Sequence, residues 1–250
     1  MPTTSLWSHW LGPGGRNRMA QRSARLCRRA LAATMPAMAE PGSVRFLPLV
    51  LVASFLTLLL TIVRTLGEAL QWHAKWFASA PGGSMSLLGI VWLVPLFGLL
   101  FGRRAAQIGS RPPFLAAFAV PLLGLAAIIA AIGWIGTKLQ GQALYDGMAT
   151  LFCGAPAVAL LGLFVWPRLF FVTLAYGLFA RIPVAVVQWL DLTQGWGTHY
   201  GMLHPSLPAD LAFDAKLRLV TLAQFGLWVP FTILAGTACA ALGAATVRRA

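Results

Sequence analysis

Side chains that could do chemistry gather in the stretch QWLDLTQGWGTHYGMLHP, residues 188–205. The stretch holds two of the four histidines, His199 and His204, together with two tryptophans and Tyr200. Imidazole is the side chain that most readily moves protons or holds a metal near neutral pH. Binding residues also favour loops that are held on a rigid frame. Two interpretations are open: a cap over the structure beneath it, or a lip of a cavity with His199 and Tyr200 selecting a ligand.

Metal binding and catalysis have no recognisable motif in this chain. His73, His199 and His204 could join nearby carboxylates around zinc, but His199 and His204 are five residues apart in a Gly- and Pro-rich loop, unlike a helical HExxH. No Gly-x-Ser-x-Gly elbow, Walker loop or Gly-x-Gly-x-x-Gly occurs. We therefore predict no metal, no cofactor and no catalytic residue. An ATPase, a dehydrogenase and an aspartyl membrane protease are disfavoured.

Two further sets of polar residues recur at helical spacing. Residues three, four or seven apart lie on one side of a helix. The first set is Ser54, Thr57, Thr61, Arg64 and Glu68, and the second is Thr173, Gly177, Arg181, Gln188 and Asp191. We predict that the two stripes face each other or a shared cavity.

Composition identifies the elements that position these residues. Hydrophobic residues make up 58% of the 250 residues and charged residues 10%, whereas soluble domains are about a quarter charged. Long charge-free windows match the ~20 apolar residues of a membrane-spanning helix and are too uniformly apolar for barrel strands. The predicted fold is an all-α, polytopic integral membrane protein of about six helices. The expected spans are 46–66, 84–102, 114–136, 148–166, 169–190 and 219–243.

An arginine at membrane depth costs from ~2.5 kcal/mol upward and nearly always faces protein or a hydrated cavity. Arg181 is such a residue, since it lies well inside the fifth predicted span. Arg181 and Arg64 either form internal ion pairs, Arg64 with Glu68, or contact an anionic ligand through the guanidinium fork. The candidate ligand-binding residues are Arg64, Glu68, Arg181, Gln188, Asp191, His199 and Tyr200.

The net charge of +13 is best explained by topology rather than by nucleic acid binding. Thirteen lysines and arginines precede the first span or lie in loops on the same predicted side, and four lie on the opposite side. The positive-inside rule then places both termini in the cytoplasm of a bacterial inner membrane and the 188–205 stretch outside. Trp72, Trp76, Trp134, Trp189 and Trp196 fall near the predicted outer ends, where an interfacial belt is expected.

The chain divides into a basic segment, 1–43, and a transmembrane domain, 44–250. The segment RNRMAQRSARLCRRALAA is rich in Arg and Ala. Four interpretations of this segment are open. It is a cytoplasmic surface helix on anionic lipid, or it is a disordered tail. Alternatively, the protein starts at Met35 or Met38 and the given start is too early, or the segment is a cleaved signal peptide with a thin apolar region. Cys27, Cys153 and Cys239 are far apart and suggest no disulfide or CxxC chemistry.

Small residues and prolines modify the predicted spans. Gly98 and Gly102, like Gly236 and Ala240, are four apart and allow close helix contact. Each span also carries a proline, such as Pro230 in the last, which removes a backbone hydrogen bond and opens gaps between helices unless neighbours compensate.

The segment ARIPVAVVQWLDLTQGWGTHYG, followed by FGLWVPFTILAGT in the last span, resembles an uncharacterised family of bacterial multi-pass membrane proteins. In that family an Ala-Arg-Ile-Pro-Val helix leads into a Trp-Gly-Thr-His-Tyr loop. The resemblance covers the last third of the chain and implies no activity and no catalytic residues. This chain departs from the family pattern after His199-Tyr200, where Gly201-Met202 replaces an acidic residue and prolines.

Three functions remain as hypotheses. The first is a non-enzymatic protein that binds or transports an anionic or amphiphilic solute, such as an anionic lipid, in an outward-facing polar cavity. The second is an auxiliary subunit whose polar stripes contact a membrane protein partner. The third is a membrane-embedded enzyme that uses His199 and its neighbours. All three have the lipid bilayer as a partner and none involves nucleic acid.

Overall fold

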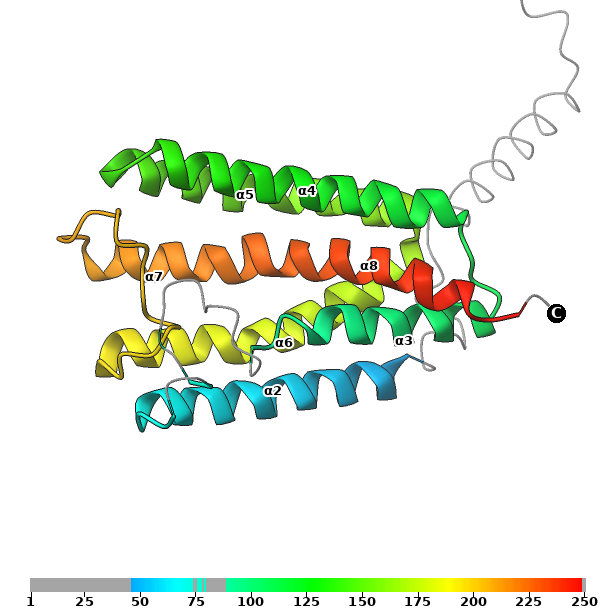
Figure 1. The fold of residues 1–250 in the computed structure, drawn as a ribbon, viewed down its shortest axis with the longest axis horizontal. Coiled ribbons are helices and arrows are strands. Elements are labelled where there is room, and N and C mark those ends of the chain that lie inside the picture. Colours follow the sequence, from blue (N-terminus) through cyan, green and yellow to red (C-terminus); the bar gives the residue numbers. More distant parts are fainter. Residues whose placement is uncertain (1–45, 74–75, 78, 80–88, 249–250) are drawn as a thin grey trace, which may run out of the picture. The chain divides into compact units, whose positions relative to one another are not determined.

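The computed structural model describes residues 46–73, 76–77, 79 and 89–248, and these form an all-helical bundle (Figure 1). The helices are α2 (Leu47–Ala69), α3 (Leu93–Gln107), α4 (Phe114–Lys138), α5 (Gly141–Val165), α6 (Pro167–Gln194), α7 (Phe213–Leu222), the π-helix η2 (Ala223–Trp228) and α8 (Val229–Ala245). No strand occurs in these residues, and the predicted fold class is confirmed. The basic segment 1–43 lies outside the described residues.

Within the described residues, five helices are long and apolar enough to cross a membrane: α2, α4, α5, α6 and the continuous helix Phe213–Ala245 that α7, η2 and α8 form together. On α2 the side turned away from the bundle carries exposed apolar residues at helical spacing, namely Leu51, Phe55, Leu59, Ile62 and Leu66. Large apolar side chains exposed in this way are expected to contact lipid. The chain is therefore a multi-pass membrane bundle.

The second predicted window, 84–102, contains a helix that differs from the prediction. Helix α3 begins at Leu93 and has 15 residues, which is about 22 Å at 1.5 Å per residue and shorter than a bilayer core of ~30 Å. It continues past Arg103 and ends before Gly109, whose φ of 80° is the left-handed conformation typical of a helix end. The apolar window and the helix end differ because a charge does not stop a helix, whereas a glycine in this conformation does. Residues 80–88 lie outside the described part.

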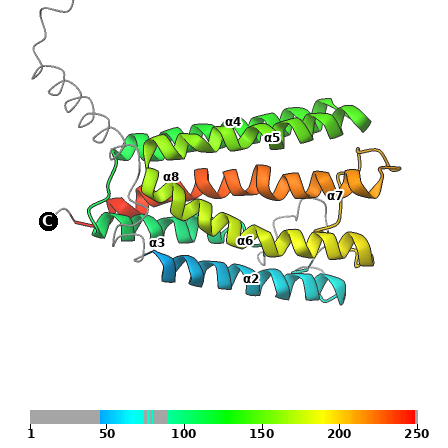
Figure 2. The same cartoon turned by 180° about the vertical axis from the view of Figure 1, so that it is seen from behind.

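Helix α8 is the centre of the bundle. It contacts α3, α4, α5 and α6, while α2 packs on α6 and α3. Figures 1 and 2 show α4 and α5 on one side of α8 and α3, α6 and α2 on the other. Helices α3 and α4 do not contact each other, so α8 alone connects them across the bundle.

The contact between α3 and α8 is close because small residues face each other. A Cβ added at Gly98 would lie 2.7 Å from the carbonyl oxygen of Gly236, and one added at Gly102 would overlap the backbone of Ala240. The predicted role of these four residues in helix packing is confirmed. Glycine thus holds the short helix α3 tightly against the central helix.

The π-helix η2 ends at Trp228, two residues before Pro230 in the first turn of α8. Proline has no N–H, so the carbonyl of Gly226 loses its usual α-helical partner. Local π-type turns are one way in which membrane helices satisfy such freed carbonyls, and they are frequent at functional sites. Pro230 therefore indicates where the helix becomes irregular. The local sequence does not indicate that the irregular turn takes the π form.

The ends of α2, α4 and α6 lie at the same end of the bundle as the start of α7 (Figure 1). Five tryptophans near these helix ends are all exposed: Trp72, Trp76, Trp134, Trp189 and Trp196. Exposed indole rings at one level suit the interface between lipid and water. The predicted candidate residues lie between this end and the middle of the bundle.

Candidate functional site

The connection between α6 and α7 begins where Gly195 ends α6. Gly195 adopts φ 67°, the left-handed conformation that glycine takes without strain, and its N–H donates to the carbonyl oxygen of Asp191 at 2.8 Å. The chain then turns back over the bundle. The local sequence thus places residues 198–207 across the ends of α2 and α6.

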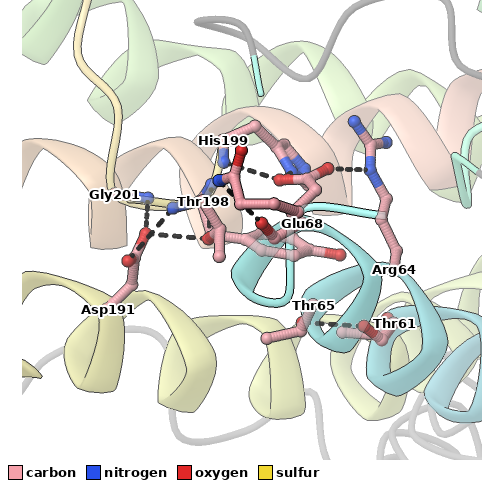
Figure 3. A network of polar contacts seen from close by, with 10 residues as sticks. Thr61, Arg64, Thr65, Glu68, Asp191, Thr198, His199 and Gly201 are labelled. Atoms are coloured by element: carbon pink, nitrogen blue, oxygen red, sulfur yellow. Dashed lines mark hydrogen bonds and ion pairs between the residues drawn. The ribbon is translucent and has the colours of Figure 1, made fainter. Parts of the chain in front are cut away.

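Asp191 holds this connection to α6. Its carboxylate accepts hydrogen bonds from the backbone N–H of Thr198 at 3.3 Å, the hydroxyl of Thr198 at 2.8 Å and the N–H of Gly201 at 2.6 Å (Figure 3). Asp191 is 3% exposed, so these bonds replace the water that the carboxylate loses. The role of Asp191 in this structure is to fold the loop.

Glu68 joins the same loop to α2. One carboxylate oxygen accepts a hydrogen bond from Arg64 Nε at 2.7 Å. The other accepts the backbone N–H of His199 at 2.8 Å and pairs with His199 Nδ1 at 2.7 Å. Figure 3 shows the Glu68 carboxylate between the Arg64 guanidinium and the His199 ring. The predicted pairing of Arg64 with Glu68 is present, and His199 is a third member.

His199 is held neutral by its surroundings. Burial of the ring lowers its pKa below the ordinary value of 6.5, and the Arg64 charge acts in the same direction, while the hydrogen bond to Glu68 opposes them. A neutral ring that donates from Nδ1 to a carboxylate keeps Nε2 as its acceptor. His199 therefore presents an oriented acceptor at neutral pH.

Tyr200 packs beside the His199 ring, with the two ring centroids 3.8 Å apart. Burial raises the pKa of Tyr200 to about 12, although the Arg64 charge, a hydrogen bond with Thr61 and the Arg181 charge oppose that shift. The phenol therefore stays protonated at physiological pH. Tyr200 contributes a neutral hydroxyl and not a counter-charge for the arginines.

Arg181 lies in the middle of α6, roughly 20 Å from either end of that helix at 1.5 Å per residue. Its Nη1 donates to Gln224 Oε1 at 3.4 Å, and its Cζ lies 4.8 Å from the centroid of the Trp228 ring. The side chain is 4% exposed, and its Nε has no hydrogen-bond partner. In the part of the chain that the structure describes, no carboxylate lies within salt-bridge distance of Arg181.

A cavity of about 1060 Å³ lies beside Arg181. Its walls come from every helix of the bundle and from the α6–α7 connection. The polar part includes Arg64, Arg181, Gln188, His199, Tyr200 and Gln224, and the remainder is mainly apolar, including Leu125, Phe152, Val184, Leu219 and Phe231. A large apolar pocket with a few convergent polar groups is the usual form of a small-molecule site. Near α3 the cavity is lined by residues 89–92, which precede the helix, and by Pro95 in its first turn.

The seven candidate residues divide into two groups. Five of them line the cavity, namely Arg64, Arg181, Gln188, His199 and Tyr200. Glu68 and Asp191 are buried but do not line it, and they position the loop instead. Of the two predicted stripes, only Arg64 on α2 and Arg181 and Gln188 on α6 line the cavity. The other members have different contacts: Thr57 bonds Tyr176 of α6, whereas Thr173 and Gly177 pack against α8.

The sequence did not predict Gln224 and Trp228, which both contact the Arg181 guanidinium. Gln224 is an amide in an otherwise apolar span, which is the one signal that pointed to it. Trp228 carried no signal, because a tryptophan near a span is usually assigned to the interface. Both residues belong to η2, and this turn presents them together to Arg181.

Metal-ligating clusters are absent from the described residues, where no three His, Cys, Asp or Glu side chains converge. Cys153 and Cys239 are free thiols, and Cys27 lies outside the described residues. Comparison with protein-family models, with curated proteins and with solved structures finds no match. A function for this chain therefore has to be inferred from the geometry of the site.

Proposed function

We propose that this protein binds an anionic or amphiphilic solute in the cavity, without chemical conversion, as a binding or transport protein of the membrane. The observation that carries the proposal is the buried Arg181 guanidinium in the cavity wall, which has no carboxylate within salt-bridge distance among the described residues. A charge at this depth costs from ~2.5 kcal/mol upward. A bound anion supplies the counter-charge that the described residues do not supply.

An anionic fluorescent probe tests this proposal. Anilinonaphthalene sulfonate is titrated into the full chain in a neutral maltoside detergent, and its fluorescence gives the affinity. We expect Arg181→Gln to weaken binding at least tenfold. Arg104→Gln, an exposed arginine on α3 away from the cavity, should leave it unchanged and controls for adsorption to basic surface. Equal affinities for the wild type and Arg181→Gln would refute the proposal.

The proposed location is a bacterial inner membrane with both termini in the cytoplasm. The asymmetry of lysine and arginine between the two predicted sides supports this orientation. It is tested with a fluorescent protein fused after Ala250 and alkaline phosphatase fused after Ser206. Fluorescence of the first and activity of the second are expected, and the reverse result would invert the topology.

The Glu68–His199 pair favours one other candidate, a membrane-embedded enzyme in which His199 accepts a proton. A carboxylate that orients a neutral imidazole is a common arrangement for a general base. His199→Asn keeps a donor for Glu68 but removes the acceptor Nε2. If the protein converts a bound amphiphile to a product seen by mass spectrometry, and His199→Asn abolishes conversion without loss of binding, the enzyme replaces the binding protein.

A further inference from the structure

The charges around the cavity restrict the ligand more narrowly than the proposed function does. Arg64 is paired with Glu68 at 2.7 Å. His199 is neutral and Tyr200 is protonated. His204 lies exposed at the rim and accepts a hydrogen bond from the N–H of Ser206. Among the described lining residues this leaves a single uncompensated charge, that of Arg181.

One buried positive charge matches one negative charge. A second negative charge on the ligand would have to leave water without a partner, which costs several kcal/mol in a protein interior. A neutral ligand would leave Arg181 unpaired. The charge balance therefore selects a monoanion.

The guanidinium can also be reached from the cavity, because Arg181 is one of its lining residues. Nη1 reaches Gln224, and one side of the guanidinium is covered by the Trp228 ring. Nε has no partner. Because Nε is itself buried, an acceptor group with two oxygens enters from the cavity and binds the N–H groups of the guanidinium that face it, as carboxylates and sulfonates do.

The rest of the cavity suits a hydrocarbon chain. Most of its lining is apolar, and its volume of about 1060 Å³ lies just above the ~300–1000 Å³ typical of sites for one small ligand. A small hydrophilic anion would leave these walls in contact with water or empty. An alkyl chain moves from lipid to an apolar wall at little cost, so the headgroup contact decides the affinity.

The exposed rim of the cavity is also mainly apolar. The exposed residues of the lining are Val91 and Trp92 at the start of α3 and Met202 and His204 in the α6–α7 connection. Three of these four side chains can contact hydrocarbon. A chain that extends past the rim therefore remains in an apolar environment.

We propose that the ligand is a single-chain amphiphile with one negative charge, whose headgroup binds the Arg181 guanidinium and whose chain lies along the apolar wall formed by Leu125, Phe152, Val184 and Phe231. This inference rests on the proposed function and names its ligand class. The headgroup chemistry is that of a carboxylate or sulfonate. A fatty acid and a synthetic alkyl sulfonate are equivalent in this respect.

The test compares four compounds with the full wild-type chain in nanodiscs of zwitterionic lipid at pH 8. They are dodecanesulfonate, a monoanion; dodecanesulfonamide, its neutral isostere; dodecyl phosphate, a dianion because its second pKa is ~6; and methanesulfonate, a monoanion without a chain. We expect dodecanesulfonate to bind at least tenfold more tightly than each of the others. This comparison needs no variant and so does not depend on a variant that folds.

Variants then locate the site. Arg181→Gln should abolish the preference for the sulfonate over the sulfonamide, Arg181→Lys should retain part of it, and Arg104→Gln should retain all of it. Equal binding of sulfonate and sulfonamide, tighter binding of the dianion, or binding of a two-chain anionic lipid as tight as that of dodecanesulfonate overturns the inference.

Two outcomes separate this inference from the proposed function. If methanesulfonate binds as tightly as dodecanesulfonate and both depend on Arg181, the cavity is an anion site and only the amphiphile inference fails. If no compound of the set binds in an Arg181-dependent way, the proposed function fails as well.

Discussion

Glu68 and His199 lie 131 residues apart in the sequence and are joined by two hydrogen bonds of 2.8 and 2.7 Å to one carboxylate oxygen. Through this contact, α2 holds the connection between α6 and α7 in place over the cavity. Because Arg64 occupies the other oxygen of the same carboxylate, the loop and the positive wall of the cavity depend on one buried acid.

Glu68→Gln is therefore expected to destabilise the protein. The amide has one acceptor oxygen for three donors and removes the negative charge paired with Arg64 Nε, and breaking a buried pair costs about 3–5 kcal/mol. At ~2–4 °C per kcal/mol for a chain of this size, Tm in detergent should fall by roughly 10 °C. The matched control is Asp146→Asn, an exposed carboxylate that pairs with Gln142 on the surface of α5. A fall no larger than that of the control contradicts the role of Glu68.

The folding stability of the protein should decrease at acidic pH, and part of this decrease should depend on His199. Burial lowers the pKa of His199 in the folded protein below 6.5, so acid protonates the unfolded chain first. The stabilisation is complete above pH 6.5 and is lost as the pH falls through the folded pKa. His199→Asn keeps a donor for Glu68 but does not titrate.

The measurement is Tm at pH 8 and pH 5.5 for both proteins. The fall in Tm from pH 8 to pH 5.5 should be larger for the wild type than for His199→Asn. Since Glu68, Arg64 and Asp191 are present in both proteins, their own contributions largely cancel in this comparison. Equal losses would show that His199 is not held neutral.

Gly201→Ala should disrupt the loop without changing any charge. An added Cβ would lie 2.5 Å from Asp191 Oδ2, so the carboxylate has to move away from Thr198 and Gly201. Loss of buried hydrogen bonds to a charged group costs about 1.5–3 kcal/mol each. Protease cleavage between residues 195 and 212 should become at least several-fold faster. Gly136→Ala, where the nearest atom is 3.9 Å away, is the control, and equal cleavage rates would argue against the role of Asp191.

Gly102→Ala should separate α3 from α8. The new Cβ overlaps the backbone of Ala240, which cannot rotate away. Overpacking of this kind typically costs about 1–3 kcal/mol, and we expect Tm to fall accordingly. Gly154→Ala on α5, with no atom within 4 Å, should change Tm little. Similar values for the two variants would contradict the close contact.

Helical periodicity explains how much of this structure could be predicted. The spacing of Thr57, Thr61, Arg64 and Glu68 predicted one buried side of α2, and all four are buried. The ion pair between Arg64 and Glu68 followed from residues four apart. The apolar windows predicted the multi-pass bundle, because a lipid-facing helix can be identified from its length and apolar composition alone.

Contacts between distant residues could not be predicted in this way. Nothing in the local sequence connects His199 with Glu68, or Arg181 with Gln224, which is 43 residues away. The π-turn before Pro230 determines which side of the last span meets Arg181, and the period of 3.6 used for prediction does not describe a π-turn. The start of α3 was also not predictable, because apolar residues continue on both sides of Leu93.

Whether Arg181 is a charge kept for a ligand is measured by the Tm of the ligand-free Arg181→Met variant. If Arg181 is a buried charge held for a ligand, its replacement by an apolar side chain of similar length is expected to leave Tm unchanged or raise it, by up to about 1–4 kcal/mol in stability, while binding of anilinonaphthalene sulfonate is lost. If Arg181 instead serves the fold, Arg181→Met lowers Tm by roughly as much as Glu68→Gln, and that result would contradict the account.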